Sequence, residues 1–130
     1  MKIATHIARY LLGAVFFVFG LNGFFNFIKL PPMPSEAGNF LGALVNTGYL
    51  MTFIKGTEVV CGALLLTGIA VPLALVALTP VLINIVLFHA YLTPPKDAAS
   101  AFVFLALHLF LVWRYRTYYR SLFTLRAAPA

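Results

Sequence analysis

The run YLMTFIKGTEVVCGALLLTGI, from Tyr49 to Ile69, is the most informative part of this chain. It is apolar and long enough to cross a bilayer, whose hydrocarbon core of about 30 Å takes about 20 helical residues. Glu58 lies near its middle. A charged side chain at the centre of a membrane helix costs about 2.5 to 3.5 kcal/mol on insertion-based scales, so it usually faces a protein interior or a wet cavity. The other segments are therefore expected to enclose Glu58.

The composition is that of an integral membrane protein. Of 130 residues, 62% are hydrophobic and 9% are charged, whereas a soluble domain has about 25% charged residues. The net charge of +6 does not predict nucleic-acid binding, because the basic residues lie mostly at the ends of apolar runs, where they act as topology signals. The single cysteine, Cys61, excludes an internal disulfide and a cysteine-rich metal site.

Four apolar runs predict an all-α fold: an integral membrane four-helix bundle that forms a single membrane domain over residues 1–130. The first run also resembles a signal peptide, but no small-x-small cleavage site follows it, so we expect a retained helix. The expected spans cover residues 8–28, 49–68, 72–92 and 98–118.

The longest loop follows the first span. Pro31, Pro32 and Pro34 end the first helix, because proline lacks the amide hydrogen and its ring clashes with the preceding turn. A short amphipathic helix is then expected in this first outer loop, beginning at Glu36 and capped by Ser35. It is either a packed connector or a lid over a cavity.

Orientation follows from the basic residues. Those on the side of the two termini are Lys2, Arg9, Arg114, Arg116, Arg120 and Arg126. Those in or toward the opposite side are Lys29, Lys55 and Lys96. This excess predicts that both termini lie in the cytoplasm, by the positive-inside rule, and hence that the number of spans is even.

A polar residue recurs at a similar depth in each span. At about 1.5 Å per residue, Glu58, Asn84 and His108 lie about 12 to 15 Å below the outer end of their helices. Asn22 lies higher, at about 9 Å, and His89 lies nearer the outer surface. We therefore predict a candidate polar layer or ligand-binding site formed by these five residues.

Two interpretations remain for the main members of this layer. Glu58 is either a proton-carrying or ligand-orienting carboxylate, or a structural carboxyl paired with Lys55 one turn away. His108 either bonds Glu58 and relays protons with it, or bridges helices or faces a neighbouring subunit. Asn84 is more typical of an interhelical contact than of a ligand contact.

The sequence lacks the motifs of metal sites, of nucleophilic catalytic sites and of phosphate-binding loops. Two membrane histidines and one glutamate, with no HExxH or ExxH pairing, predict no metal site. The sequence contains no nucleophile with an activating base and no glycine-rich phosphate loop. No catalytic residue is identified.

Five segments together carry a family likeness, and they span most of the chain. They are RYLLG (Arg9–Gly13), FGLNG (Phe19–Gly23), PPMP (Pro31–Pro34), EVVCGALLLTG (Glu58–Gly68) and PVLINIVLFH (Pro80–His89). In these segments the chain resembles the DoxX-like family of small four-helix bacterial membrane proteins.

The resemblance implies a multi-pass protein of the bacterial inner (cytoplasmic) membrane. Some relatives are subunits of thiosulfate:quinone oxidoreductase and others are linked to oxidative-stress complexes. We therefore expect a subunit or accessory of a quinone-linked redox complex, with quinone as the candidate cofactor. The expected partners are the lipid bilayer and either redox-complex subunits or further copies of the chain, but not nucleic acid.

Two alternatives differ in mechanism. The first is a structural or assembly subunit without chemistry of its own. The second is a small proton-coupled exporter, a class that also combines four helices with one membrane glutamate. In the small multidrug exporters that glutamate lies in the first helix, whereas Glu58 lies in the second.

Overall fold

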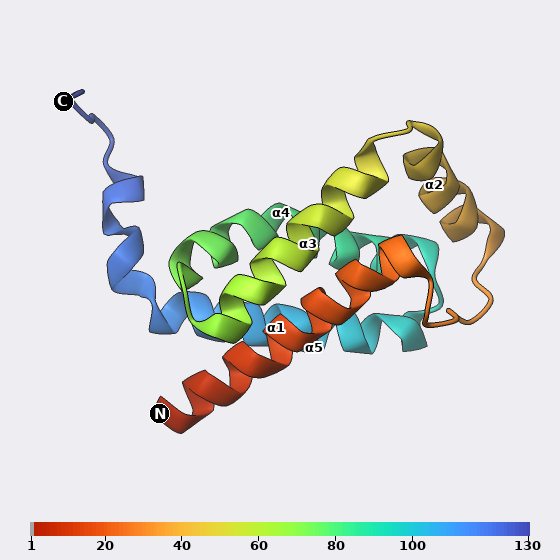
Figure 1. The fold of residues 1–130 in the computed structure, drawn as a ribbon, viewed down its shortest axis with the longest axis horizontal. Helices are drawn as coiled ribbons and strands as arrows, with labels where there is room; N and C mark the ends of the chain where they lie inside the picture. Colours follow the sequence, from red (N-terminus) through yellow and green to blue (C-terminus); the bar gives the residue numbers. More distant parts are fainter. Residues whose placement is uncertain (1) are drawn as a thin grey trace.

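A computed structural model describes residues 2–130, and all regular elements within that range are helices (Figure 1). The longer ones are α1 (Lys2–Phe25), α2 (Ser35–Asn46), α3 (Leu50–Thr67), α4 (Val71–Leu92) and α5 (Ala98–Arg114). Two 3-10 segments, η1 (Pro95–Asp97) and η2 (Arg116–Phe123), flank α5. In this part of the chain, four helical stretches are long and apolar enough to cross a membrane: α1, α3, α4 and η1 with α5. The predicted all-α membrane fold is confirmed.

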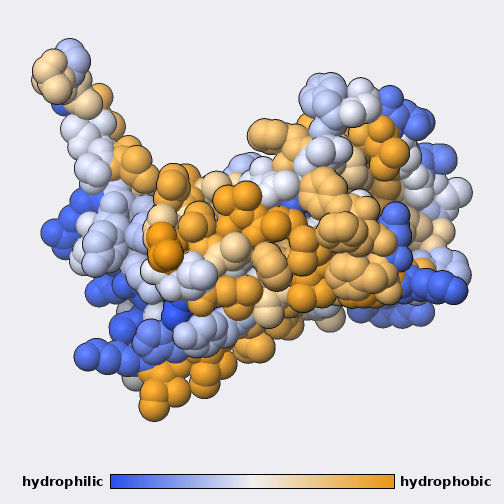
Figure 2. All heavy atoms as spheres, in the orientation of Figure 1, coloured by the Kyte–Doolittle hydropathy of each residue, from blue (hydrophilic) through white to orange (hydrophobic). Residues whose placement is uncertain are grey.

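The four long helices pack side by side. The most extensive contact joins α1 to α3, and further contacts join α4 to α5, α3 to α4 and α1 to α5. Both chain ends lie at the same end of this bundle (Figure 1). Figure 2 shows hydrophobic side chains over the middle of the bundle and hydrophilic ones concentrated toward its two ends. This is the surface expected of a protein whose middle faces lipid.

Glycines set the close approach of α1 and α3. A Cβ atom added to Gly62 would lie 2.9 Å from the carbonyl oxygen of Gly13 and 2.9 Å from the Cα atom of Phe17. No larger residue fits there without moving a backbone, so small residues bring the helices together, as is common in membranes. In the sequence, Gly13 and Gly20 fall on one face of this helix and Asn22 on a different one, and residue spacing alone does not tell which face points inward. In the structure Gly13, Gly20 and Asn22 are all buried.

The core is formed mainly by leucines. The fully buried large side chains are Leu12, Leu65, Leu75, Leu78, Leu82 and Leu111. Many other large apolar side chains of the span helices are exposed, such as Phe53, Leu73 and Val103. In water such a surface would be costly, but lipid tails solvate it, so the exposed apolar side chains support membrane insertion.

Three helix ends differ by three or more residues from the predicted spans, and the first is the start of α1, which lies at Lys2 and not at residue 8. Helix α1 ends at Phe25, before the expected limit at Ile28, because Asn26 adopts a left-handed backbone conformation with φ of 51°. Helix α5 ends at Arg114 rather than at Tyr118, and the chain continues as the tighter η2. There the hydroxyl of Tyr119 donates a hydrogen bond to the Pro72 carbonyl at 3.2 Å, which ties η2 to the start of α4.

The expected amphipathic helix in the first loop is present as α2. It begins at Ser35, not Glu36, and Ser35 makes no capping hydrogen bond, because Pro34 and not Ser35 occupies the position before the first turn. Ala37 is buried, and the ring of Phe40 lies 5.8 Å from that of Phe88 in α4. These contacts are those of a packed connector between the spans.

Candidate functional site

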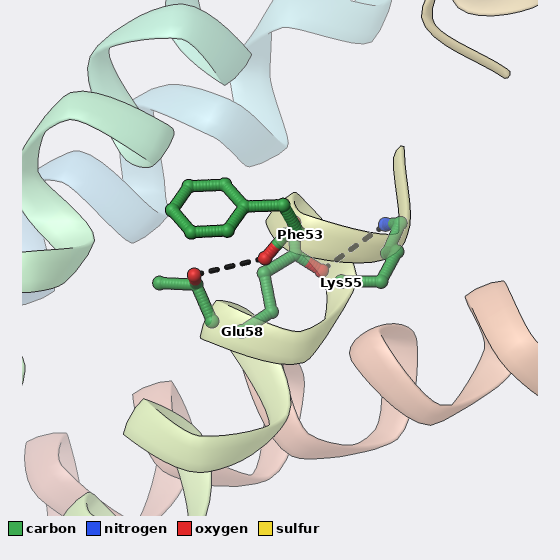
Figure 3. A network of polar contacts seen from close by, with 4 residues as sticks. Phe53, Lys55 and Glu58 are labelled. Atoms are coloured by element: carbon green, nitrogen blue, oxygen red, sulfur yellow. Dashed lines mark hydrogen bonds and ion pairs between the residues drawn. The ribbon is translucent and has the colours of Figure 1, made fainter. Parts of the chain in front are cut away.

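Glu58 lies in the interior of the bundle with only 3% of its surface exposed. The ammonium Nζ of Lys55, one turn earlier in α3, donates a hydrogen bond to its Oε2 atom at 3.1 Å (Figure 3). This is the only ion pair among residues 2–130. The structure therefore contains the Lys55 partner that the sequence suggested as one of two alternatives.

Two glycines of α1 make room for this ion pair. A Cβ atom at Gly20 would lie 3.1 Å from the Cβ of Glu58, and one at Gly23 would overlap the side chain of Lys55. The Lys55 side chain is 25% exposed, whereas that of Glu58 is 5% exposed. Lys55 thus connects a buried carboxylate with the protein surface, near the C-terminal end of α1.

Next to the ion pair, Asn22 holds the turn that follows α1. Its amide nitrogen donates to the Ile28 carbonyl at 3.2 Å, and its amide oxygen accepts from the Ile28 backbone N–H at 2.7 Å. A cavity of about 430 Å³ lies at this turn, and it is lined by Asn22, Asn26, Ile28, Lys29 and Leu30. Asn22 therefore has a structural role at this turn and also borders the cavity.

His108 bridges α5 to α4. Its Nε2 atom lies 2.9 Å from the Leu75 carbonyl oxygen and 3.3 Å from the Thr79 hydroxyl. The carbonyl can only accept, so Nε2 carries the proton. Nδ1 is buried without a partner among residues 2–130. No hydrogen bond joins His108 to Glu58, and the histidine has the helix-bridging contacts of the second interpretation.

The remaining predicted site residues are on α4, and neither reaches Glu58. His89 is half-buried, with Nδ1 2.9 Å from the Ile85 carbonyl and its ring 5.2 Å from that of Phe88. Asn84 is exposed on the outside of the bundle, and its side chain makes no hydrogen bond within residues 2–130. No hydrogen bond therefore joins any two of the five residues of the predicted polar layer within residues 2–130.

Arg9 is a buried polar residue that the sequence indicated as a topology signal and as part of a family segment, but not as a member of the polar layer. It is 6% exposed, and its Nη1 donates to the Leu65 carbonyl at 2.6 Å. Nη2 lies 3.4 Å from Nδ1 of His6, and the guanidinium stacks over the Tyr10 ring at 4.6 Å. The available signal was its position within the first predicted span, where an arginine needs internal acceptors.

Metal-ligating side chains do not converge in the described residues: no three histidine, cysteine, aspartate or glutamate side chains lie close enough together to hold an ion. Cys61, one turn after Glu58, is buried and unpaired. The chemistry available at this site is therefore that of one carboxylate, one ammonium group and neighbouring amides.

Comparison with known families gives a match to the DoxX family. The model of the DoxX family matches residues 4–90, which include Asn22, Glu58, Asn84 and His89 but not His108. Neither the curated proteins nor the solved structures that were compared include a match.

Proposed function

Because the chain belongs to the DoxX family, we propose that it is a multi-pass subunit of a quinone-linked redox complex in the bacterial inner membrane, with both termini in the cytoplasm. Residues 1–130 form a single membrane domain in this proposal. The observation that carries it is the buried carboxylate of Glu58, held by Lys55. The Lys55 side chain packs at Gly23, the residue that follows Asn22 in α1, and Asn22 lines the cavity at the turn after α1, here called the outer cavity. A buried ionisable pair within a membrane helix typically marks a proton or ligand path.

The lining of the outer cavity fits the head group of a quinone. Asn26 and Lys29 present donors for carbonyl oxygens, while Ile28 and Leu30 present apolar side chains to the ring. A bound quinone supplies the capacity to take up two electrons and two protons. Lys55 and Glu58 would hold exchangeable protons on the bundle side of this cavity, and Asn22 would keep its wall in place through its two bonds to Ile28.

The exposed position of Asn84 supports the proposal that this chain is part of a larger complex. Its amide has no partner within residues 2–130, and it lies between exposed Ile83 and Leu87 on the outer face of α4. An amide that faces lipid alone loses hydrogen bonds that a neighbouring helix can restore. We assign this face of α4 to the contact with a partner subunit or a second copy.

The test is purification from native membranes in mild detergent, followed by mass spectrometry of the proteins and extraction of bound quinone. The proposal expects an oxidoreductase partner and quinone to co-purify, and Glu58→Gln to abolish quinone-dependent turnover while the complex stays assembled. Glu36→Gln is the matched control, because Glu36 is an exposed carboxylate of α2. Isolation of the chain without partner and without quinone would refute the proposal.

A structural subunit without chemistry is the second candidate. It is favoured by the bonds of Asn22, His108 and Arg9, whose acceptors or donors are backbone groups of this same chain. Under this hypothesis, Glu58→Gln leaves the turnover of the partner intact. The same purified complex therefore distinguishes the two functions.

A further inference from the structure

We propose that the cavity between η2, α4 and α5 binds an anionic phospholipid, with its phosphate at Arg116 and its apolar part against α4 and α5. The cavity has a volume of about 250 Å³ and lies at the end of the bundle where the chain termini are found. It is separate from the outer cavity beside Asn22. The residues that matter are Val76 of α4, Val112 of α5, and Arg116, Tyr119, Leu122 and Phe123 of η2.

The cavity has a fixed wall. Tyr119 is 8% exposed, and its hydroxyl donates to the Pro72 carbonyl at 3.2 Å. Burial, and to a smaller extent Tyr115, raises the pKa of the Tyr119 hydroxyl, so it remains a neutral donor at physiological pH. This bond holds η2 against the start of α4 and thereby keeps the cavity open between the three elements.

Arg116 supplies the cation. Its Nη1 donates to the Trp113 carbonyl at 2.9 Å, and its guanidinium lies 5.0 Å from the centre of the Trp113 ring. Those contacts orient the group but use only one of its five N–H donors. It has no carboxylate partner within residues 2–130. A guanidinium fork with free donors matches the paired oxygens of a phosphate.

The surrounding charge selects an anion. Arg114 lies two residues before Arg116 and Arg120 four residues after it, and Arg126 follows η2. The three acidic residues lie elsewhere: Glu36 in α2, Glu58 in α3 and Asp97 in η1. This end of the bundle therefore attracts negative charge without competition from internal carboxylates.

The apolar lining selects a lipid rather than a free anion. Val76 and Val112 belong to span helices, so they bring the cavity to membrane depth. Leu122 and Phe123 are 65% and 79% exposed, and they stand beside the arginines as in segments that lie in the membrane interface. Inorganic phosphate would leave these side chains uncovered, whereas a phospholipid offers a glycerol and acyl region to cover them.

The experiment uses Trp113, the single tryptophan of the chain, as a reporter beside Arg116. The full chain is reconstituted into vesicles of phosphatidylcholine with phosphatidylglycerol, and one of the two lipids at a time is brominated in its acyl chain. Quenching of Trp113 fluorescence then gives the relative binding constant of the two lipids near the cavity. We expect stronger quenching by brominated phosphatidylglycerol than by brominated phosphatidylcholine.

Arg116→Gln should lower this relative binding constant about fivefold, since one arginine near an anionic surface contributes about 1 kcal/mol. Arg126→Gln removes the same charge from the same end of the bundle but not from the cavity, so it should retain the preference. An equal effect of both variants would show that the lipid preference comes from the general positive charge of this surface and not from the cavity, and it would overturn the proposal.

Two further measurements use the unaltered chain, so they do not depend on the folding of a variant. Equal quenching by the two brominated lipids would overturn the proposal. Excess sodium phosphate, compared with sodium chloride at the same ionic strength, distinguishes a free anion from a lipid. A persistent preference for phosphatidylglycerol supports the lipid site, and its loss in phosphate would assign the arginine to soluble anions instead.

Discussion

The guanidinium of Arg9 in α1 donates a hydrogen bond to the backbone carbonyl of Leu65 in α3, at 2.6 Å. Leu65 belongs to the last turn of α3, where carbonyl oxygens lack partners within the helix and carry the negative end of its dipole. Gly68, with φ of 78°, ends the helix directly beside the guanidinium. Arg9 therefore caps α3 from a different helix.

Replacing Arg9 by methionine should destabilise the bundle by about 1.5 to 3 kcal/mol, the usual contribution of a hydrogen bond to a charged group. The measurement is unfolding in detergent micelles, followed by circular dichroism. Arg126→Gln serves as control, because Arg126 is exposed and should leave the unfolding midpoint unchanged. Equal midpoints for Arg9→Met and the unaltered chain would show that the cap contributes nothing.

Alanine at Gly62 should destabilise the chain by about 1 to 3 kcal/mol, because the added Cβ forces α1 and α3 apart. The contact atoms are backbone atoms of Gly13 and Phe17, which cannot rotate away. Gly56→Ala is a matched change in the same helix, and there a Cβ meets open space. It should be neutral or stabilising by up to about 1 kcal/mol, since alanine favours helix. The same unfolding measurement compares the two variants, and equal effects would contradict the packing argument.

Replacing Lys55 should lower the free energy of unfolding more than removing the charge of Glu58 does. Lys55→Met leaves a buried carboxylate without its partner, with an expected cost of up to about 3 kcal/mol. Glu58→Gln leaves a partly exposed lysine that can turn toward the surface, so its cost should be smaller. The double variant should recover part of the stability lost in Lys55→Met. A double variant less stable than both single ones would contradict this account of the ion pair.

His108 and Glu58 should behave independently in stability. His108→Leu removes the bond to the Leu75 carbonyl and should cost about 1 kcal/mol. Because the two side chains share no hydrogen bond, the double variant with Glu58→Gln should be additive within about 0.5 kcal/mol. A larger coupling energy in this double-mutant cycle would contradict this prediction and support the interpretation in which His108 and Glu58 interact as a proton-relay pair.

Apolar run length, proline positions and composition were enough to predict the helical membrane class and the amphipathic helix of the first loop. These features depend on local physics, since about 20 apolar residues without charge are stable as a helix in lipid wherever they occur. Glu58 also stood out from sequence, because an ionisable residue in such a run is rare. Its pairing with Lys55 is a contact between positions one turn apart, and helical spacing alone brings them close.

The partners of the other polar residues depended on how the helices rotate and pack. Depth along a helix is known from residue number, but the face that a side chain occupies depends on which neighbours approach closely. Gly13 and Gly62 allow α1 and α3 to pack closely against each other. His108 bonds the Leu75 carbonyl and not Glu58, and Asn84 lies exposed on the outside of the bundle. Arg9 is the clearest case: its position in the sequence indicated topology, whereas its carbonyl partner lies 56 positions away and becomes its neighbour only when α1 and α3 pack.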